Sequence, residues 1–149
     1  MRIAPGDNGF SMIELIVALV VMGILTAIAL PNWNRLLPAY ALNNSVRQIQ
    51  SELHSIKMRA AAENVGFQFA YVQGANDYTI QRDSKALVTK PIAEGTNMTK
   101  DGTISFSPRG TASGNRVRLR NSAGVCKQVV VSPTGRVRIC SPNSCAEDC

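Results

Sequence analysis

Apolar and small residues run from Phe10 to Leu30, and Glu14 is the only charge among them. As an α-helix, this segment would rise roughly 30 Å at ~1.5 Å per residue, about the thickness of one bilayer core. The pattern therefore predicts that the first part of the chain is a membrane anchor.

A second helical pattern follows Pro31. Its apolar positions recur at alternating steps of four and three, which places them on one face of a helix. They are Leu42, Val46, Ile49, Leu53, Ile56 and Ala60. This helix is expected to end near residues 64–66. A coiled coil would show a similar stripe, but Pro31 and Pro38 interrupt it, and Pro38 can kink the helix.

From Gly66 onward the period changes to two, which is typical of half-buried strands. Strands are predicted at Phe67–Tyr71, Tyr78–Arg82, around Ile104 and Phe106, and at Arg116–Arg120, Val125–Val131 and Arg136–Cys140. Residues 85–101 are less regular and are expected to form a surface loop with at most a short strand. Short connectors between the last three strands predict antiparallel hairpins. The expected fold class is α+β, with one long N-terminal helix packed on an antiparallel sheet.

Glu14 has two interpretations. A charge inside a membrane segment costs about 2.5–3.5 kcal/mol, so such a charge is normally present because it has a partner. A glutamate in the first turn of a helix is instead favoured by the helix macrodipole and can sit among the lipid headgroups. The spacing alone leaves both interpretations open.

The residues from Gly9 to Leu15, GFSMIEL, resemble the class III signal of type IV pilins and type II secretion pseudopilins. The resemblance implies that a prepilin peptidase cuts between Gly9 and Phe10, and that Phe10 becomes the N-methylated first residue. Glu14 would then pair with the N-terminal amine of a neighbouring subunit in the filament. Pro31 matches the proline that often ends the apolar segment of this family.

The chain is accordingly expected to have three parts. Residues 1–9 form the cleaved leader, which has no apolar core of its own. Residues 10–64 form the long helix, whose first half (10–30) spans the membrane. Residues 65–149 form a β-rich head domain with a disulfide-bonded C-terminal tail.

All four cysteines lie near the C-terminus, at positions 126, 140, 145 and 149. They suggest an oxidising compartment, and four cysteines allow three pairings. Their spacing lacks the paired C-x2-C knuckles of a zinc site. If residues 132–135 close a hairpin, Cys126 and Cys140 lie nearly opposite one another. We therefore expect the pairs Cys126–Cys140 and Cys145–Cys149.

The formal net charge is +6, and its distribution is uneven. No acidic residue occurs from 102 to 146, whereas seven basic residues do: Arg109, Arg116, Arg118, Arg120, Lys127, Arg136 and Arg138. Strand alternation places Arg116, Arg118 and Arg120 on one face, and Arg136 and Arg138 likewise share a face. Such a surface can attract a polyanion, although any solvated outer sheet face also carries polar side chains.

Phe106 is the only aromatic residue in this basic stretch. Base stacking is therefore disfavoured, and binding to nucleic acid would be directed to phosphates without regard to sequence.

A second resemblance covers the same region. Residues 129–139, VVVSPTGRVRI, are similar to the C-terminal hairpin of FimT/GspH-type minor pilins, and residues 104–110, ISFSPRG, fit the same family. In some FimT-type minor pilins a G-R-x-R motif binds DNA during natural transformation. The matching residues here are Gly135-Arg136-Val137-Arg138. The chain is thus identified as a type IV pilin-like protein of this family.

The resemblances imply a minor pilin of a type IV pilus, which joins other major and minor pilins at the pilus tip or initiation complex and binds double-stranded DNA through its phosphates. It would cross the inner membrane once before assembly and lie in the pilus at the cell surface afterwards. The alternative is a GspH-like minor pseudopilin of a type II secretion system, in a periplasmic pseudopilus.

A membrane-tethered enzyme or adhesin is a third class. His54 is the only histidine, no nucleophile, base and acid can be grouped, and no glycine-rich phosphate loop follows a strand. We therefore expect no catalysis, no cofactor and no metal.

Overall fold

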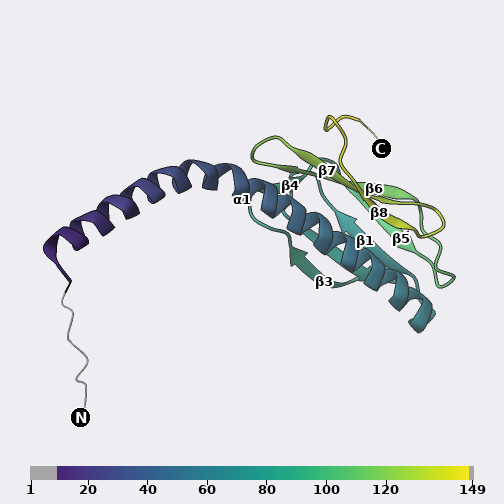
Figure 1. Cartoon of the computed structure of the whole chain (residues 1–149). Coiled ribbons are helices and arrows are strands. Elements are labelled where there is room, and N and C mark those ends of the chain that lie inside the picture. The colour runs from purple at the N-terminus through teal and green to yellow at the C-terminus, as the bar shows by residue number, and fades with distance from the viewer. Residues whose placement is uncertain (1–9, 148–149) are drawn as a thin grey trace, which may run out of the picture. The chain divides into compact units, whose positions relative to one another are not determined.

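The computed structural model describes residues 10–147, without the side chains of residues 30–35. Two expectations, the leader ending at Gly9 and the pairing of Cys149, thus fall on residues outside the described part. The chain forms two compact units, Met1–Leu36 and Leu37–Cys149, which we describe separately. One helix and, within the described residues, eight strands make up these units (Figure 1).

Helix α1 runs from Met12 to Glu63 and is continuous through Pro31 and Pro38. It begins at Ser11, whose hydroxyl accepts a hydrogen bond of 3.2 Å from the backbone N–H of Glu14. This is the usual N-cap arrangement, which satisfies an amide that lacks a partner inside the helix. It places Glu14 in the first turn, where the macrodipole favours an anion.

The helix ends where the sequence predicts. Asn64 adopts a left-handed conformation with φ 54°, and the N–H of Val65 donates to the carbonyl of Ala60 at 3.3 Å. This bond spans the last turn in the manner of a Schellman cap, so it satisfies a carbonyl that would otherwise lack a donor.

The first unit contains the apolar half of α1. Met12–Ala29 has a mean hydropathy of 2.6, and none of it is buried within the protein. By length and composition, this is the one helix segment among the described residues that can cross a membrane.

The second unit is built around the other half of α1. The predicted apolar stripe is buried from Leu42 to Ala60, with exposed fractions of 1% or less. The strands of this unit are β1 (Phe67–Tyr71), β2 (Asp77–Arg82), β3 (Lys85–Pro91), β4 (Thr96–Met98), β5 (Gly102–Phe106), β6 (Asn115–Asn121), β7 (Cys126–Val131) and β8 (Val137–Cys140).

The α+β fold is confirmed, but the strands form two sheets rather than one. Their orders are β3-β2-β1-β5 and β4-β6-β7-β8, and all neighbours are antiparallel. The hydroxyl of Tyr71 in the first sheet donates to the carbonyl of Arg116 in the second at 2.9 Å. Burial, with a contribution from Asp101, raises the pKa of Tyr71 to about 12.

The expected loop at residues 85–101 is wrong, because it contains β3 and β4. β3 is an edge strand whose side chains are exposed on both faces except for Lys90, so no apolar alternation reveals it. Its pairing with β2 defines it instead. β4 has only three residues, of which Thr96 and Met98 are buried.

Candidate nucleic-acid interface

The arginines of the second sheet lie on its outer face, which we define as the side of β6, β7 and β8 that points away from the core. In register across these strands, Arg116 lies opposite Val130, which lies opposite Arg138. The side chains between these rows are buried and face the core: Val117, Leu119, Val129, Val131 and Val137. The register therefore agrees with the expected alternation.

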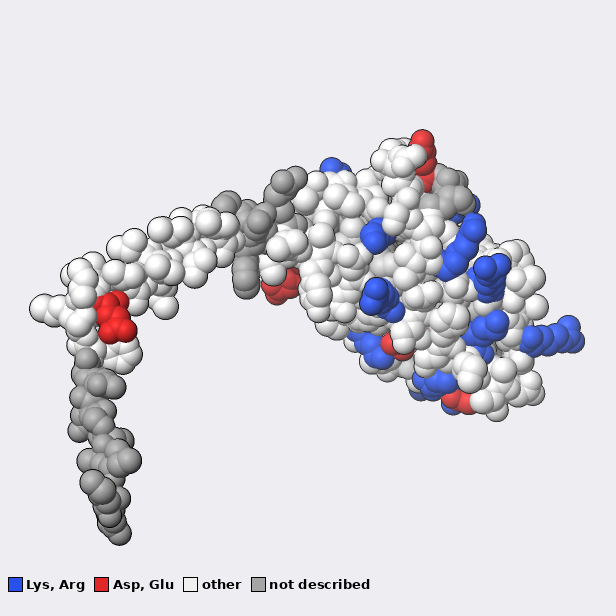
Figure 2. Space-filling model, viewed as in Figure 1, with Lys and Arg blue, Asp and Glu red and all other residues white. Residues whose placement is uncertain are grey.

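The arginines on this face differ in exposure. Arg120, Arg136 and Arg138 are exposed, whereas Arg116 and Arg118 are half-buried. Arg136 and Arg138 line one shallow hollow of about 260 Å³ together with Val130, Ser132 and Thr134. Figure 2 shows Lys and Arg side chains spread over the side of the head that carries β6 and β8 in Figure 1, with few acidic ones.

Lys127 is not on this face. It lies opposite Leu119 in the register, and its Nζ donates to Oδ1 of Asn43 on α1. Its charge therefore belongs to the helix side of the sheet.

A tight turn contains Arg136, the first of the two exposed arginines of the G-R-x-R sequence, and leads into β8, which carries Arg138. Its backbone bonds run from Ser132 N–H to the Arg136 carbonyl at 3.0 Å and from Gly135 N–H to the Ser132 carbonyl at 2.8 Å. The hydroxyl of Ser132 also accepts from the N–H of Arg136 at 3.2 Å. Since β8 begins at Val137, Arg136 belongs to this turn rather than to the strand, and its N–H and its carbonyl are both hydrogen-bonded to Ser132.

Gly135 is required at this turn for two reasons. Its φ of +73° lies in the left-handed region, which side chains rarely adopt. A Cβ at this position would also collide with the carbonyl oxygen of Gly110 and approach the side chain of Lys57. Sequence reasoning missed Lys57, because nothing in the helical pattern distinguishes it from other polar positions on α1.

The C-terminal tail is bonded to the outer face by a disulfide between Cys126 and Cys145, whose Cα atoms are 5.3 Å apart. The expected pairs Cys126–Cys140 and Cys145–Cys149 are therefore wrong. The register explains the difference: Cys140 lies opposite Gln128, two residues along β7 from Cys126. Such diagonal neighbours are about 7–8 Å apart, farther than most disulfides allow. Cys140 is itself disulfide-bonded.

This tail contacts the outer face at Gln128. Gln128 has no exposed surface, although it points away from the core, and its Nε2 donates to the carbonyl of Glu147 at 2.6 Å. Arg118 lies opposite Gln128 in the register and is half-buried. The exposed arginines of the face are Arg120, Arg136 and Arg138.

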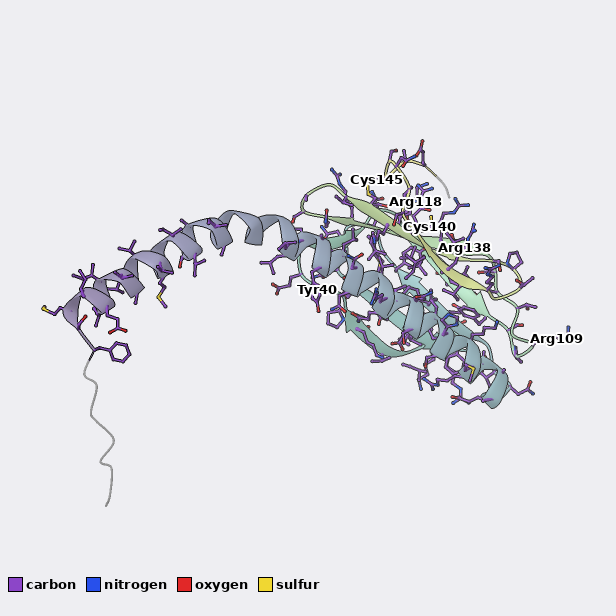
Figure 3. All side chains as sticks on the ribbon, viewed as in Figure 1. Tyr40, Arg109, Arg118, Arg138, Cys140 and Cys145 are labelled. Atoms are coloured by element: carbon purple, nitrogen blue, oxygen red, sulfur yellow. A yellow bond between two sulfur atoms is a disulfide. The ribbon has the colours of Figure 1, made fainter. Side chains whose placement is uncertain are left out.

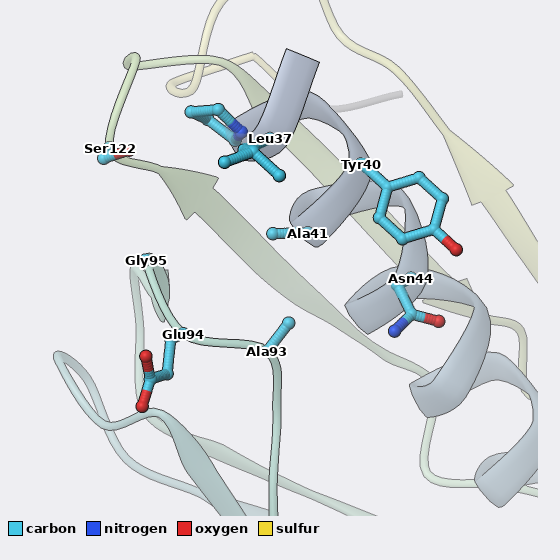
Figure 4. Close-up of a pocket in the computed structure, with 9 residues that line it drawn as sticks. Leu37, Tyr40, Ala41, Asn44, Ala93, Glu94, Gly95 and Ser122 are labelled. Atoms are coloured by element: carbon cyan, nitrogen blue, oxygen red, sulfur yellow. The ribbon is translucent and has the colours of Figure 1, made fainter. Parts of the chain in front are cut away.

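An apolar groove of about 550 Å³ lies between α1 and the β3–β4 loop (Figure 4). Leu37 and Tyr40 line it and are 51% and 73% exposed. Tyr40 and Lys57 are 17 positions apart on α1, roughly 25 Å at the rise of a helix. The groove is therefore separate from the turn at residues 132–136, which Lys57 contacts.

Among the residues that the structure describes, no group of three or more histidine, cysteine, aspartate or glutamate side chains could hold a metal ion. His54 is exposed on the surface of α1.

Family models match two parts of the chain. A prokaryotic N-terminal methylation motif matches residues 5–30, and the model of type II transport protein GspH matches residues 45–135. The chain belongs to the GspH family of type IV pilin-like proteins. A comparison with curated proteins finds no significant match.

Solved structures of two kinds share the fold. The type IV minor pilin FimU of Pseudomonas aeruginosa is 12% identical with a TM-score of 0.54, and the alignment covers 70% of this chain and 99% of FimU. The minor pseudopilin EpsH from the type 2 secretion system of Vibrio cholerae is 10% identical with a TM-score of 0.55, covering 69% and 98%. The family and these neighbours are structural pilins and pseudopilins, not enzymes.

Proposed function

We propose that this member of the GspH family is a minor pilin of a type IV pilus that binds DNA without sequence preference. The family supports the coarser statement: the chain is a pilin-like subunit of a type IV pilus or a type II secretion system, and associates with other pilins in a filament. In this proposal, a prepilin peptidase processes the chain at Gly9, Phe10 is methylated, and the inner membrane holds the chain before assembly at the pilus tip or initiation complex.

The observation that carries the DNA-binding proposal is the placement of Arg136 and Arg138. Both are exposed, both line one hollow, and the turn before them is fixed by backbone and hydroxyl bonds. A guanidinium stays charged and can grip a phosphate with two donors. The sequence holds no aspartate or glutamate from position 102 to position 146, so this part of the chain is rich in positive charge. Arg120 is exposed at another margin of the same face, and Arg116 and Arg118 contribute from half-buried positions.

The alternative is a minor pseudopilin of a type II secretion system. The matching family model carries the description of a type II transport protein, and EpsH is as similar in fold as FimU. Two features favour the pilus: the paired arginines after Gly135, and the disulfide-bonded tail, which suits exposure on the cell surface. Deleting the gene and measuring both surface pili and secreted enzymes separates the two systems.

The test of DNA binding is a titration of the head, residues 37–149, with duplex DNA at several salt concentrations. This fragment contains every residue of the hydrophobic core, so it keeps the packing that holds the arginines. We expect a dissociation constant on the order of 10⁻⁴–10⁻⁶ M, with log affinity falling by about 0.9 per contacted phosphate for each decade of salt.

The decisive variant is Arg136→Gln with Arg138→Gln, which should abolish binding while the head stays folded, because both side chains are exposed and neither is part of the core. Its matched control is Lys85→Gln with Lys100→Gln, which removes two exposed cations elsewhere on the head. No binding by the unaltered head at low salt, or equal loss in both double variants, would overturn the proposal.

A further inference from the structure

The β5–β6 loop and the β7–β8 turn are locked together at one end of the head. Ala112 in the loop donates its N–H to the carbonyl of Pro133 in the turn at 3.0 Å. Gly110 and Gly135 approach so closely that their backbones leave no room for a side chain at position 135. We call this pair of segments, residues 107–114 and 132–136, the double turn.

Hydrogen bonds also fix the β5–β6 loop segment of the double turn. Ser107 N–H donates to the Thr111 carbonyl at 2.9 Å, and Gly110 N–H donates to the Ser107 carbonyl at 2.9 Å. The hydroxyls of Ser107 and Thr111 are 2.7 Å apart. Arg109 is inside this closed loop, and its exposed side chain projects from the head (Figure 3).

The backbone segments that carry Arg109 and Arg136 therefore lie side by side. Arg109 immediately precedes Gly110, Arg136 immediately follows Gly135, and these two glycines are in contact. Lys57 of α1 lies beneath both segments, because its Nζ donates to the Gly135 carbonyl at 3.0 Å and its Cε is 3.6 Å from the Cβ position of Gly110. Two exposed arginines from distant parts of the sequence thus project from one braced unit.

We propose that Arg109 is a phosphate-binding residue of the same surface as Arg136 and Arg138, so that the double turn contacts the DNA backbone from both of its segments. The inference rests on the proposed DNA binding and extends it to a residue outside the G-R-x-R motif. Because hydrogen bonds already fix the backbones of both segments of the double turn, little additional backbone conformational freedom is lost when DNA binds. The ligand is double-stranded DNA recognised by its charge, because no aromatic side chain is available in the double turn for stacking on bases.

The test uses the full chain in a neutral detergent, titrated with labelled duplex DNA between about 0.05 and 0.3 M salt. Arg109→Gln should weaken binding about three- to tenfold at the lowest salt and should reduce the slope of log affinity against log salt by about 0.9. Arg109→Lys should keep the slope of the unaltered chain, since it keeps the charge. Lys100→Gln is the matched control: it removes one exposed cation near the start of β5, whereas Arg109 follows the end of that strand.

Unchanged affinity and slope in Arg109→Gln, while Arg136→Gln with Arg138→Gln loses binding, would overturn this inference and leave the proposed function intact. An equal loss in Lys100→Gln would overturn it as well, because the effect would then be one of net charge. No binding by the unaltered chain would overturn the proposed function, and this inference with it.

Discussion

Lys57 on α1 donates a hydrogen bond of 3.0 Å to the backbone carbonyl of Gly135, 78 residues later in the chain. The bond joins the buried half of the long helix to the turn that precedes Arg136. A helix that packs on the core thereby also fixes the end of the sheet where the accessible arginines lie. The position of these arginines consequently depends on helix–sheet packing as well as on their own turn.

Gly135→Ala should destabilise the head more than an ordinary glycine replacement. Its left-handed φ costs about 1–2 kcal/mol for a residue with a Cβ, and the collision with the Gly110 carbonyl adds to this. The control is Gly74→Ala, since Gly74 has a φ of +78° but open space around its Cβ position. Urea unfolding measures both, and equal losses would show that the double turn is not tightly packed.

The disulfide between Cys126 and Cys145 should hold the tail against the outer face. It closes a loop of 19 residues, so replacing both cysteines by alanine should lower the free energy of unfolding by about 2–4 kcal/mol. The buried amide of Gln128 should become accessible in the same variant, because the tail that covers it is released. Peptide mapping of the oxidised protein checks the pairing, and a peptide that links Cys126 to Cys140 would contradict it.

Tyr71 should make the stability of the head fall at high pH. Its pKa is raised from 10.0 to about 12, so the folded state favours the protonated phenol. The stabilisation is complete below about pH 10 and is lost as the pH rises towards 12, with a total of roughly 2–3 kcal/mol.

Tyr71→Phe should weaken that pH dependence, leaving the part that comes from Tyr78, whose pKa is also raised by burial. At pH 7 the variant should lose about 1 kcal/mol, because the carbonyl of Arg116 loses its donor. Tyr40→Phe is a suitable control, as Tyr40 is 73% exposed. An unchanged pH profile in Tyr71→Phe would show that Tyr71 is not the titrating group.

Glu14→Ala should reduce incorporation into filaments without changing the melting temperature of the head. Glu14 lies in the first turn of α1, in a unit whose described side chains are not part of the core. Quantifying the protein in sheared filaments and in membranes checks this prediction. Normal incorporation would leave Glu14 with the role of a charge at a helix N-terminus, capped by Ser11.

Processing between Gly9 and Phe10 should yield a mature chain of 140 residues (149 − 9) with a methylated N-terminus. Replacing Gly9 by a bulky residue should leave the precursor in the membrane, because the cleavage junction is changed. Mass spectrometry of the unaltered protein distinguishes the two forms, and an intact leader would refute the prediction.

Local patterns were sufficient to predict α1, its apolar stripe, six of the strands and the face that carries the arginines. The reason is that the periods of a helix and of a half-buried strand are written directly into consecutive residues, as in Leu42–Ala60 and Arg116–Arg120. Strand β3 escaped prediction because its exposed residues show no alternation, and only its pairing with β2 makes it a strand.

Other features depend on contacts between residues far apart in the chain, and only the folded structure decides them. The strand register places Cys140 opposite Gln128, so Cys126 is joined to Cys145 in the tail instead. The tail then buries Gln128, while Arg120, Arg136 and Arg138 stay exposed. The sequence alone does not distinguish these three arginines from the half-buried Arg116 and Arg118. Lys57 and the loop that carries Arg109 are likewise brought to the turn at residues 132–136 by contacts at Gly135. The Lys57 side chain bonds to the Gly135 carbonyl, and the Gly110 backbone lies against Gly135.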